Sequence, residues 1–291
     1  MAYTVKIRNA SGDTLQLYPS EDYLLTSITG ITPALAVINA TEMATMDGSR
    51  FNSSHVSFRN IVITFKIRGQ GADVRARRVN LYKYIHPKHP VRVYIANDQR
   101  DVYIDGYVES LDDAGSIFSD NELLQVSVIC PDPYFRDNTE VEAENTFGSN
   151  TSLFYFPFGI LQGSPIPFSR KIIQQHHTII NEGDAACGIT LQVAASGAVT
   201  NPTFYNESNG QTMTFELTMQ AGDELVISTV QGQKSAKRIR EGVETNIINT
   251  MTHGSAWLQL EPGDNVIYYS AASGTAAMTL TFLYTILYEG I

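Results

Sequence analysis

The sequence is poor in cysteine. Cys130 and Cys187 are the only two cysteines among 291 residues, and neither has Cys-x-x-Cys spacing or a histidine at metal-site spacing. We expect both to be reduced and buried as small apolar residues. An interdomain disulfide is the alternative, because the two residues fall in different halves of the chain.

Long apolar runs are also missing. No stretch approaches the roughly 20 apolar residues that a membrane helix needs. Residues 1–8 alternate like a strand and lack the apolar core of a signal peptide. We therefore expect no membrane insertion and a protein made and folded in the cytoplasm.

Charged residues are scarce, at 17% of the chain, and the formal net charge is -10. Binding to nucleic acid requires Lys and Arg to neutralise phosphates, so we expect no direct recognition of nucleic-acid sequence. Hydrophobic residues make up 43% of the chain, which is typical of a globular protein.

Catalytic motifs are absent. The sequence has no phosphate-binding loop, GxGxxG turn, GxSxG elbow or HExxH pair. His176 and His177 are strand neighbours that point to opposite faces, and His86 and His89 flank a helix end. The glutamates between positions 140 and 144 lie in a predicted linker. We expect no enzymatic activity, catalytic residue, cofactor or metal.

A strand that ends at two prolines divides the chain. The alternating pattern up to Cys130 stops at Pro131, which cannot donate a hydrogen bond to a sheet, and a polar acidic segment follows Phe135. At this length two domains are expected. We predict one domain at residues 1–135, a linker at 136–152 and a second domain at 153–291.

The first half reads as strands with one helix. Strands are predicted at residues 3–8, 14–18, 55–68, 91–96, 102–108 and 123–129, and a helix capped by Asp73 at 74–85. This pattern indicates an α+β unit in which one helix lies against a barrel or sandwich of strands. Residues 22–45 are expected to be either extended or loop-rich, although they are too apolar for disorder.

Two groups of residues in this half are candidates for a subunit interface. The apolar residues within residues 22–45 have to be buried against something, and another subunit could supply that surface. The basic residues on the predicted helix form either a solvated face or a contact with an acidic neighbour. The candidates are Ile28, Ile31, Leu35, Val37, Ile38, Arg75, Arg77 and Arg78.

The second half shows short strand patterns separated by Gly-Asp turns, which is typical of a β-sandwich or jelly roll. It opens on an aromatic cluster at residues 154–158. This cluster is either an entry strand that packs into the core or an exposed platform for sugar rings.

Several motifs together resemble one known family. They are the Asp47-Gly48 turn before the long strand with Arg59, the helix that ends at His86-Pro87-Lys88, and the exit Cys130-Pro131-Asp132-Pro133-Tyr134-Phe135. In this order they resemble the distal tail protein of long-tailed bacteriophages. The resemblance implies a mainly β chain with an N-terminal split β-barrel carrying one helix and a C-terminal galectin-like β-sandwich or jelly roll.

The resemblance also implies a function. The family's first domain builds a hexameric ring that joins the tail tube protein to the tip or baseplate hub protein and to receptor-binding proteins. The chain is then a structural virion protein without catalytic residues. The alternative is a carbohydrate-binding module for host cell-wall glycans, with Tyr205, Trp257 or the 154–158 cluster as platforms. Trp257 lacks the following arginine of a galectin sugar site, which favours an attachment scaffold.

Overall fold

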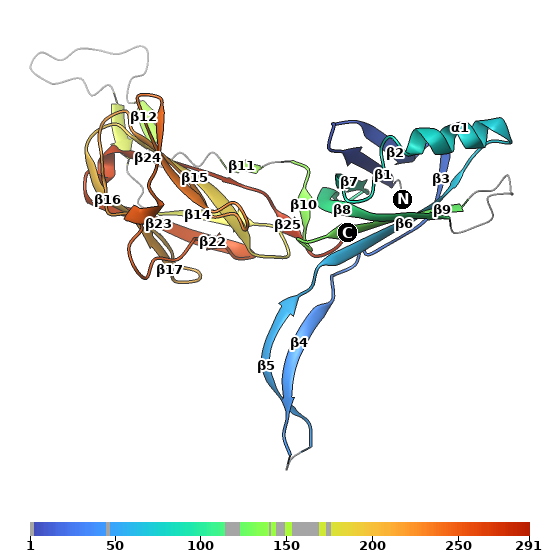
Figure 1. Cartoon of the computed structure of the whole chain (residues 1–291). Helices are drawn as coiled ribbons and strands as arrows, with labels where there is room; N and C mark the ends of the chain where they lie inside the picture. The colour runs from blue at the N-terminus through green and yellow to red at the C-terminus, as the bar shows by residue number, and fades with distance from the viewer. Residues whose placement is uncertain are drawn as a thin grey trace, which may run out of the picture. The chain divides into compact units, whose positions relative to one another are not determined.

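The computed structural model describes residues 3–44, 47–113, 123–139, 141–143, 149–152, 169–172 and 176–291. The fold is mainly antiparallel β with one α-helix in the described part, as the sequence predicts (Figure 1). The chain forms two compact units, unit 1 with Met1–Thr139 and Leu287–Ile291, and unit 2 with Glu140–Ile286. The predicted boundaries of the domains and linker stay a prediction.

Unit 1 is built on one large sheet with the order β2-β1-β7-β8-β9-β6-β3. In addition, β10 pairs with β8, and β25 pairs with β10. No pairing between the end strands β2 and β3 closes this sheet in the described residues, so it is open, as in a split barrel. Its elements are β1 Thr4–Asn9, β2 Thr14–Tyr18, β3 Tyr23–Thr29, β4 Ala36–Glu42, β5 Ser49–Val56, β6 Arg59–Ile67, α1 Ala72–Leu81, β7 Pro90–Ala96, β8 Asp101–Asp113, β9 Leu123–Cys130, β10 Phe135–Asp137 and β25 Leu287–Tyr288.

The core of unit 1 follows from strand alternation. In β6, Ile61, Ile63 and Phe65 are fully buried, while the residues between them are at least partly accessible. Because side chains on a strand alternate between faces, one face of the sheet collects the apolar residues. Helix α1 adds Val74 and Leu81 to this core.

Helix α1 is shorter than the predicted segment 74–85 and starts two residues earlier. Asp73 lies in its first turn, and Gly71 occupies the N-cap position without a side-chain hydrogen bond. The prediction that Asp73 caps the helix is therefore wrong. An acidic residue in the first turn still interacts favourably with the helix dipole.

Of the two alternatives expected for residues 22–45, extended or loop-rich, the structure shows the extended one over most of the segment. This segment contains β3, which pairs with β6, and β4, which pairs with β5. Strands β4 and β5 form a separate two-stranded sheet that projects from unit 1 (Figure 1); we call residues Ala36–Val56 the arm. The predicted strand at 55–68 is likewise divided, since β5 ends at Val56 and β6 begins at Arg59.

The end of the chain returns to unit 1. Strand β25 pairs with β10 through Phe135 opposite Tyr288 and Arg136 opposite Leu287. Unit 2 is thus an insertion between Thr139 and Leu287. No local pattern of the sequence indicates this return of residues 287–291 to unit 1.

Unit 2 contains two main sheets, β11-β24-β15-β19-β20-β21 and β14-β23-β16-β17, each of which buries one face. This layout is that of a β-sandwich. Its elements are β11 Val141–Ala143, β12 Ser149–Ser152, β13 Ser169–Ile172, β14 His176–Asn181, β15 Cys187–Ala195, β16 Val199–Asn206, β17 Gln211–Thr214, β18 Thr218–Met219, β19 Glu224–Ser228, β20 Ser235–Arg240, β21 Val243–Asn246, β22 Gln259–Leu260, β23 Gly263–Ser273, β24 Met278–Tyr284 and the 3-10 helices η1 Ile248–Thr250 and η2 Thr275–Ala277.

Some strands of unit 2 have no counterpart in the alternation of the sequence. Strands β20 and β21 were not predicted, because β20 carries three basic residues and β21 is exposed throughout. No helix in the described residues is long and apolar enough to cross a membrane.

Candidate functional site

A buried arginine, Arg59, joins four separate segments of unit 1. Its side chain donates hydrogen bonds to the backbone oxygens of Gly30 at 2.6 Å, Thr32 at 2.5 Å, Pro133 at 2.7 Å and Glu289 at 2.6 Å. Only 3% of Arg59 is exposed. We call these five residues the Arg59 junction. It ties the segment before the arm, the exit after β9 and the C-terminal return to the first residue of β6.

The buried charge of Arg59 is stabilised because four backbone carbonyls accept hydrogen bonds from its guanidinium. Burial lowers the pKa of Arg59, yet an arginine remains protonated in proteins. The guanidinium also lies over the ring of Phe135, a favourable cation–π contact. A planar fork of five donors suits several carbonyls at once, which a lysine ammonium does not reproduce.

Two glycines make the close approaches around the junction feasible. Gly30 has φ +82°, and a Cβ there would lie 2.0 Å from the backbone oxygen of Asn60. In β8, a Cβ on Gly106 would lie 2.8 Å from Sγ of Cys130. Cys130 is opposite Arg59 in the sheet register. Strands β6 and β9 pair through Arg59 and Cys130. Glycine is therefore required on either side of this pair, at Gly30 next to β6 and at Gly106 next to β9.

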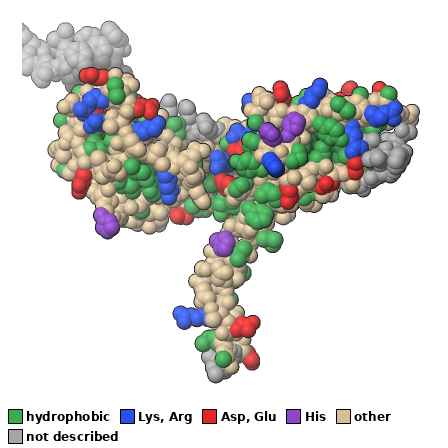
Figure 2. All heavy atoms as spheres, viewed as in Figure 1, with side chains coloured by type: hydrophobic (Ala, Val, Ile, Leu, Met, Phe, Trp, Pro, Cys, Tyr) green, Lys and Arg blue, Asp and Glu red, His purple; other side chains and the backbone are tan. Residues whose placement is uncertain are grey.

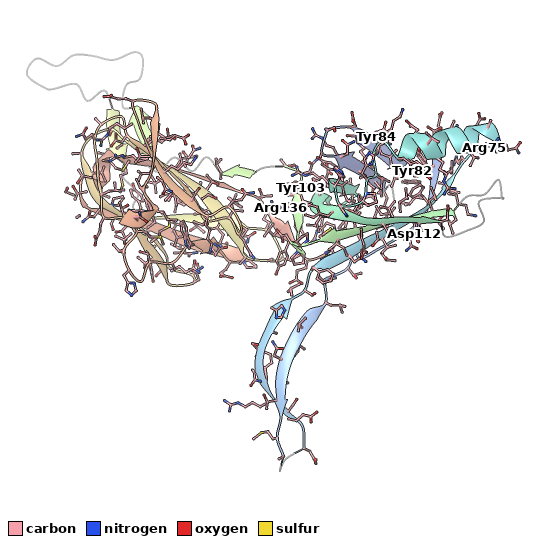
Figure 3. The ribbon with its side chains drawn as sticks, viewed as in Figure 1. Arg75, Tyr82, Tyr84, Tyr103, Asp112 and Arg136 are labelled. Carbon is pink, nitrogen blue, oxygen red and sulfur yellow. The ribbon has the colours of Figure 1, made fainter. Side chains whose placement is uncertain are left out.

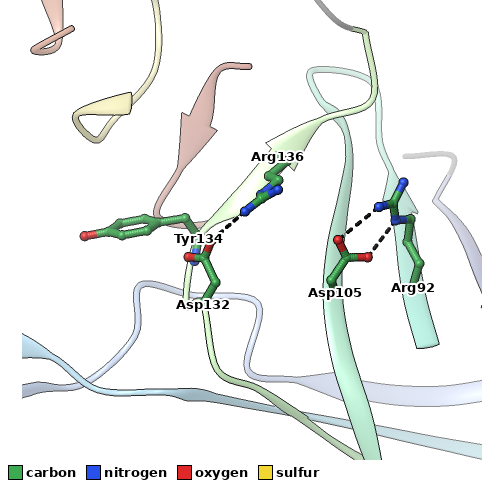
Figure 4. A network of polar contacts seen from close by, with 5 residues as sticks. All are labelled: Arg92, Asp105, Asp132, Tyr134 and Arg136. Carbon is green, nitrogen blue, oxygen red and sulfur yellow. Dashed lines mark hydrogen bonds and ion pairs between the residues drawn. The ribbon is translucent and has the colours of Figure 1, made fainter. Parts of the chain in front are cut away.

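The exit after β9 is a structured turn. Oδ1 of Asp132 accepts a hydrogen bond from the backbone N–H of Tyr134 at 3.2 Å, and Oδ2 pairs with Arg136 at 2.8 Å. Figure 4 shows this pair beside the bidentate Arg92–Asp105 pair, with the ring of Tyr134 pointing away. After Pro131 and Pro133 interrupt pairing, the chain re-enters the sheet as β10. The segment from Pro131 to Tyr134 thus ends β9 and positions β10 for pairing with β8.

The C-terminal return is held by side chains as well as by strand pairing. The guanidinium of Arg100 lies 4.1 Å from the ring centroid of Tyr288 and also donates to the backbone oxygen of Gly290. The Tyr288 hydroxyl lies 3.1 Å from Oδ2 of Asp137. Backbone N–H of Ile291 donates to the oxygen of Ile31. The last residues are therefore integrated into unit 1.

The arm has one apolar face and one polar face. Cross-strand partners share a face, and the register places Ile38 opposite Ser54 and Ala40 opposite Phe51. A β-bulge between these pairs leaves Asn52 without a partner and brings Phe51 onto the face of Ile38. This face carries Ala36, Ile38, Ala40, Phe51 and Val56 together with Ser54, and it ends at the pair Glu42 and Ser49 near the tip; we call it the apolar face.

The opposite face of the arm is mainly polar and is linked by the hydrogen bonds Asn39–Ser53 and Asn52–Thr41. Ile38 is 66% exposed and Phe51 61% exposed. Figure 2 shows hydrophobic side chains at the base and near the tip of the arm. Asp47 and Gly48 lie at the tip, where Gly48 has φ 94°. Nothing in the described residues of the chain covers the apolar face.

The structure separates the apolar interface candidates into two groups. Ile28 and Ile31 are partly buried against the core of unit 1. Leu35, Val37 and Ile38 are exposed, and the last two belong to the arm. The sequence showed the apolar character of this segment but did not show which residues remain accessible.

The basic residues of α1 also differ in environment. Arg77 pairs with Asp22 at 2.8 Å, and Arg78 pairs with Asp113 at 2.5 Å. Hydrogen bonds to Tyr82 and Asp113 raise the pKa of Arg78. Figure 3 shows Arg75 on the outer side of the helix, and its side chain is exposed. Arg75 is thus the helix arginine best placed for a partner.

The candidate histidines, cysteines and aromatic residues from the sequence lie in separate environments. No group of three or more His, Cys, Asp or Glu residues in the described part of the chain could hold a metal ion. The rings of His86 and His89 lie 5.6 Å apart. Both cysteines are free and buried. Trp257 is partly buried near Lys234, and the 154–158 cluster lies outside the described residues.

Two family models match the chain in order. Residues 11–147 match the phage tail protein RIFT-related domain. Residues 182–285 match the C-terminal domain of the siphovirus-type tail component. No curated protein matches the chain.

Solved structures share the fold over nearly the whole chain. The Dit protein of phage SPP1, described as a paradigm of the hub adsorption apparatus in phages that infect Gram-positive bacteria, is 13% identical with a TM-score of 0.70, and 99% of each chain is covered. A chain of the phage p2 baseplate in its activated conformation with Sr is 9% identical with a TM-score of 0.51, over 97% of this chain and 98% of that one. At these identities the likeness shows the fold alone.

Proposed function

Because this chain belongs to the siphophage distal tail protein family, a family of structural tail components, we propose that it assembles into a hexameric ring at the distal end of the tail. The two domain models, matched in chain order over most of the sequence, are the observation that carries the proposal. In this role unit 1 builds the ring. Unit 2 offers a docking surface to proteins of the tail tip.

The arm supplies a ring contact. A two-stranded hairpin alone is marginally stable in water, and this one exposes Ile38 and Phe51 on one face. A cyclic ring uses heterologous contacts, in which one surface of each subunit meets a different surface of the next. An amphipathic arm that its own subunit leaves uncovered is suited to such a contact. Arg75 on α1 provides a second, charged contact.

In this role the Arg59 junction stiffens unit 1 where the arm joins its sheet. The backbone before the arm, at Gly30 and Thr32, the exit after β9 at Pro133 and the C-terminal return at Glu289 all bond to one buried side chain. These bonds hold the segment that leads into the arm against the sheet of unit 1. This suits a passive structural hub, and no catalytic role is assigned to any residue.

The partners in this role are the tail tube protein on one side and the baseplate hub and receptor-binding proteins on the other. The chain is then a virion component that is assembled in the host cytoplasm. Cryo-electron microscopy of virions, with gold labelling of a tag on the chain, tests this directly. Label at the tail end distal to the capsid is expected, and label along the tail shaft or on the capsid would refute it.

A further inference from the structure

A row of three ring side chains crosses the outer face of one sheet in unit 2. His176 of β14, Tyr268 of β23 and Tyr205 of β16 are direct partners in the strand register. Ring centroids are 5.5 Å apart for His176 and Tyr268, and 6.3 Å apart for Tyr268 and Tyr205. The three strands that carry the row are labelled in Figure 1. The rings thus form one continuous strip, which we call the aromatic row.

The aromatic row does not belong to the core of the sandwich. Ile267 and Tyr269, on either side of Tyr268, are buried, whereas Tyr268 is exposed. Phe204 and Asn206 flank Tyr205 in the same way. Packing between the rings stabilises the sheet, yet Tyr205 and Tyr268 each remain 36% exposed. Core packing therefore does not account for rings at these positions.

Neighbouring side chains extend the row into a mixed apolar and polar surface. Val266 lies on the same face as Tyr268, and Ile180, on β14, is 54% exposed. The carboxylate of Glu207 lies near the hydroxyl of Tyr268 and raises its pKa. Amphipathic rings beside fixed hydrogen-bonding groups are suited to ligands that have apolar and hydroxylated faces together.

The charge on this face restricts the class of ligand. Two exposed carboxylates lie on this face: Glu207 directly follows β16, and Asp264 lies on β23 four residues before Tyr268. The outward-facing residues described on β14, β23, β16 and β17 include no Lys or Arg. This charge disfavours polymers that carry phosphate or carboxylate groups. Sugar rings without charge have C–H faces that pack on aromatic rings and hydroxyls that bond to Glu207 and to the tyrosines.

We propose that the aromatic row of unit 2 is a binding site for uncharged polysaccharides, with Tyr205 and Tyr268 as the stacking residues and Glu207 as a hydrogen-bond acceptor. The site adds a glycan-binding activity to the structural role and does not depend on ring formation. It is distinct from Trp257, which lies in the segment before β22.

The test is calorimetric titration of the full chain with a panel of soluble uncharged glycans, namely dextran, mannan, galactan, a β-glucan and oligomers of N-acetylglucosamine. Binding to at least one member is expected. The double variant Tyr205→Ala/Tyr268→Ala should bind that glycan about tenfold more weakly or not at all. Tyr268→Phe keeps the ring and should lose less.

Tyr107→Ala is the matched control, because Tyr107 is a 50% exposed tyrosine of unit 1, and it should bind like the wild type. Sodium polyphosphate serves as the anionic comparison and should not bind. The proposal is overturned if no panel member binds at millimolar concentration, if the double variant binds as well as the wild type, or if polyphosphate binds more tightly than the glycans.

Discussion

The guanidinium of Arg59 lies 4.5 Å from the ring centroid of Phe135, and both side chains are shielded from water. Arg59 is the first residue of β6 and Phe135 the first of β10. The contact therefore joins the strand that follows the arm to the strand that leads toward unit 2. Four backbone carbonyls complete the environment of Arg59. One side chain therefore holds together β6, the segment before the arm, the exit after β9 and the C-terminal return.

Replacing Arg59 with methionine should lower the unfolding free energy of unit 1 by about 3–5 kcal/mol, since buried carbonyls lose their donors. Arg92→Met is the matched control, because Arg92 pairs with Asp105 at the surface, and it should cost about 1 kcal/mol or less. Urea unfolding measures both changes. Equal effects of the two substitutions would show that the junction is not special.

The C-terminal return should contribute measurably to unit 1. Tyr288→Ala removes the contact with Arg100 and the hydrogen bond to Asp137, and we expect a loss of about 1–2 kcal/mol. Hydrogen exchange should rise in β10, which pairs with β25. Exchange in β20 of unit 2 provides the internal reference and should not change. Unaltered exchange in β10 would contradict the integration of the C-terminus.

The arm should control assembly without controlling folding. In the double variant Ile38→Ser/Phe51→Ser, exposed apolar side chains are removed, so the unfolding free energy should change by less than about 0.5 kcal/mol per site. The oligomer should nevertheless dissociate in light-scattering measurements. Arg50→Ser/His55→Ser alters the polar face of the same arm and should assemble normally. Intact assembly of the first variant would remove the arm from the interface.

The two cysteines should be inert to thiol reagents in the native state. Burial raises the pKa of Cys130 and of Cys187 to about 12, and the thiolate is the reactive form. With Ellman's reagent at pH 8, labelling should occur only on unfolding. Because Cys130 lies in unit 1 and Cys187 in unit 2, variants with one cysteine report on each unit separately. Rapid labelling of the folded protein would contradict the buried positions.

Acid should weaken unit 2 through Asp223. The hydrogen bond from Arg240 holds the pKa of this carboxyl below its usual range. A carboxyl with a lowered pKa in the folded state stabilises the protein above its unfolded pKa, near about 4. This stabilisation is lost as the pH falls through the folded value. Asp223→Asn should therefore be less stable than the wild type at pH 6, and the difference should shrink below about pH 4. A constant difference would refute the linkage.

Much of the fold could be predicted from alternation in the sequence. The strands around Ile61, Val93 and Val126 each bury one face, and that burial produces the pattern from which they were recognised. The arm left no such pattern, because neither of its faces is buried within the subunit. Strand β20 could not be predicted for a related reason. Its basic residues Lys237, Arg238 and Arg240 interrupt the alternation of apolar residues.

The site was only partly visible in the sequence. Arg59 and the exit from Cys130 to Phe135 were identified as a motif, but the motif did not reveal that Arg59 bonds to Pro133. Its contact with Glu289 spans 230 positions, and no local pattern encodes a contact at that separation. The same limit applies to the aromatic row, whose members come from three strands that are distant in the chain.

The mass of the purified chain in native mass spectrometry tests the central claim most directly. The account predicts a particle of six chains for the wild type and a shift to monomers for Ile38→Ser/Phe51→Ser. A wild-type protein that remains monomeric at every concentration would contradict the ring. A six-chain particle that is unaffected by the arm substitutions would keep the ring and reject the arm as its contact.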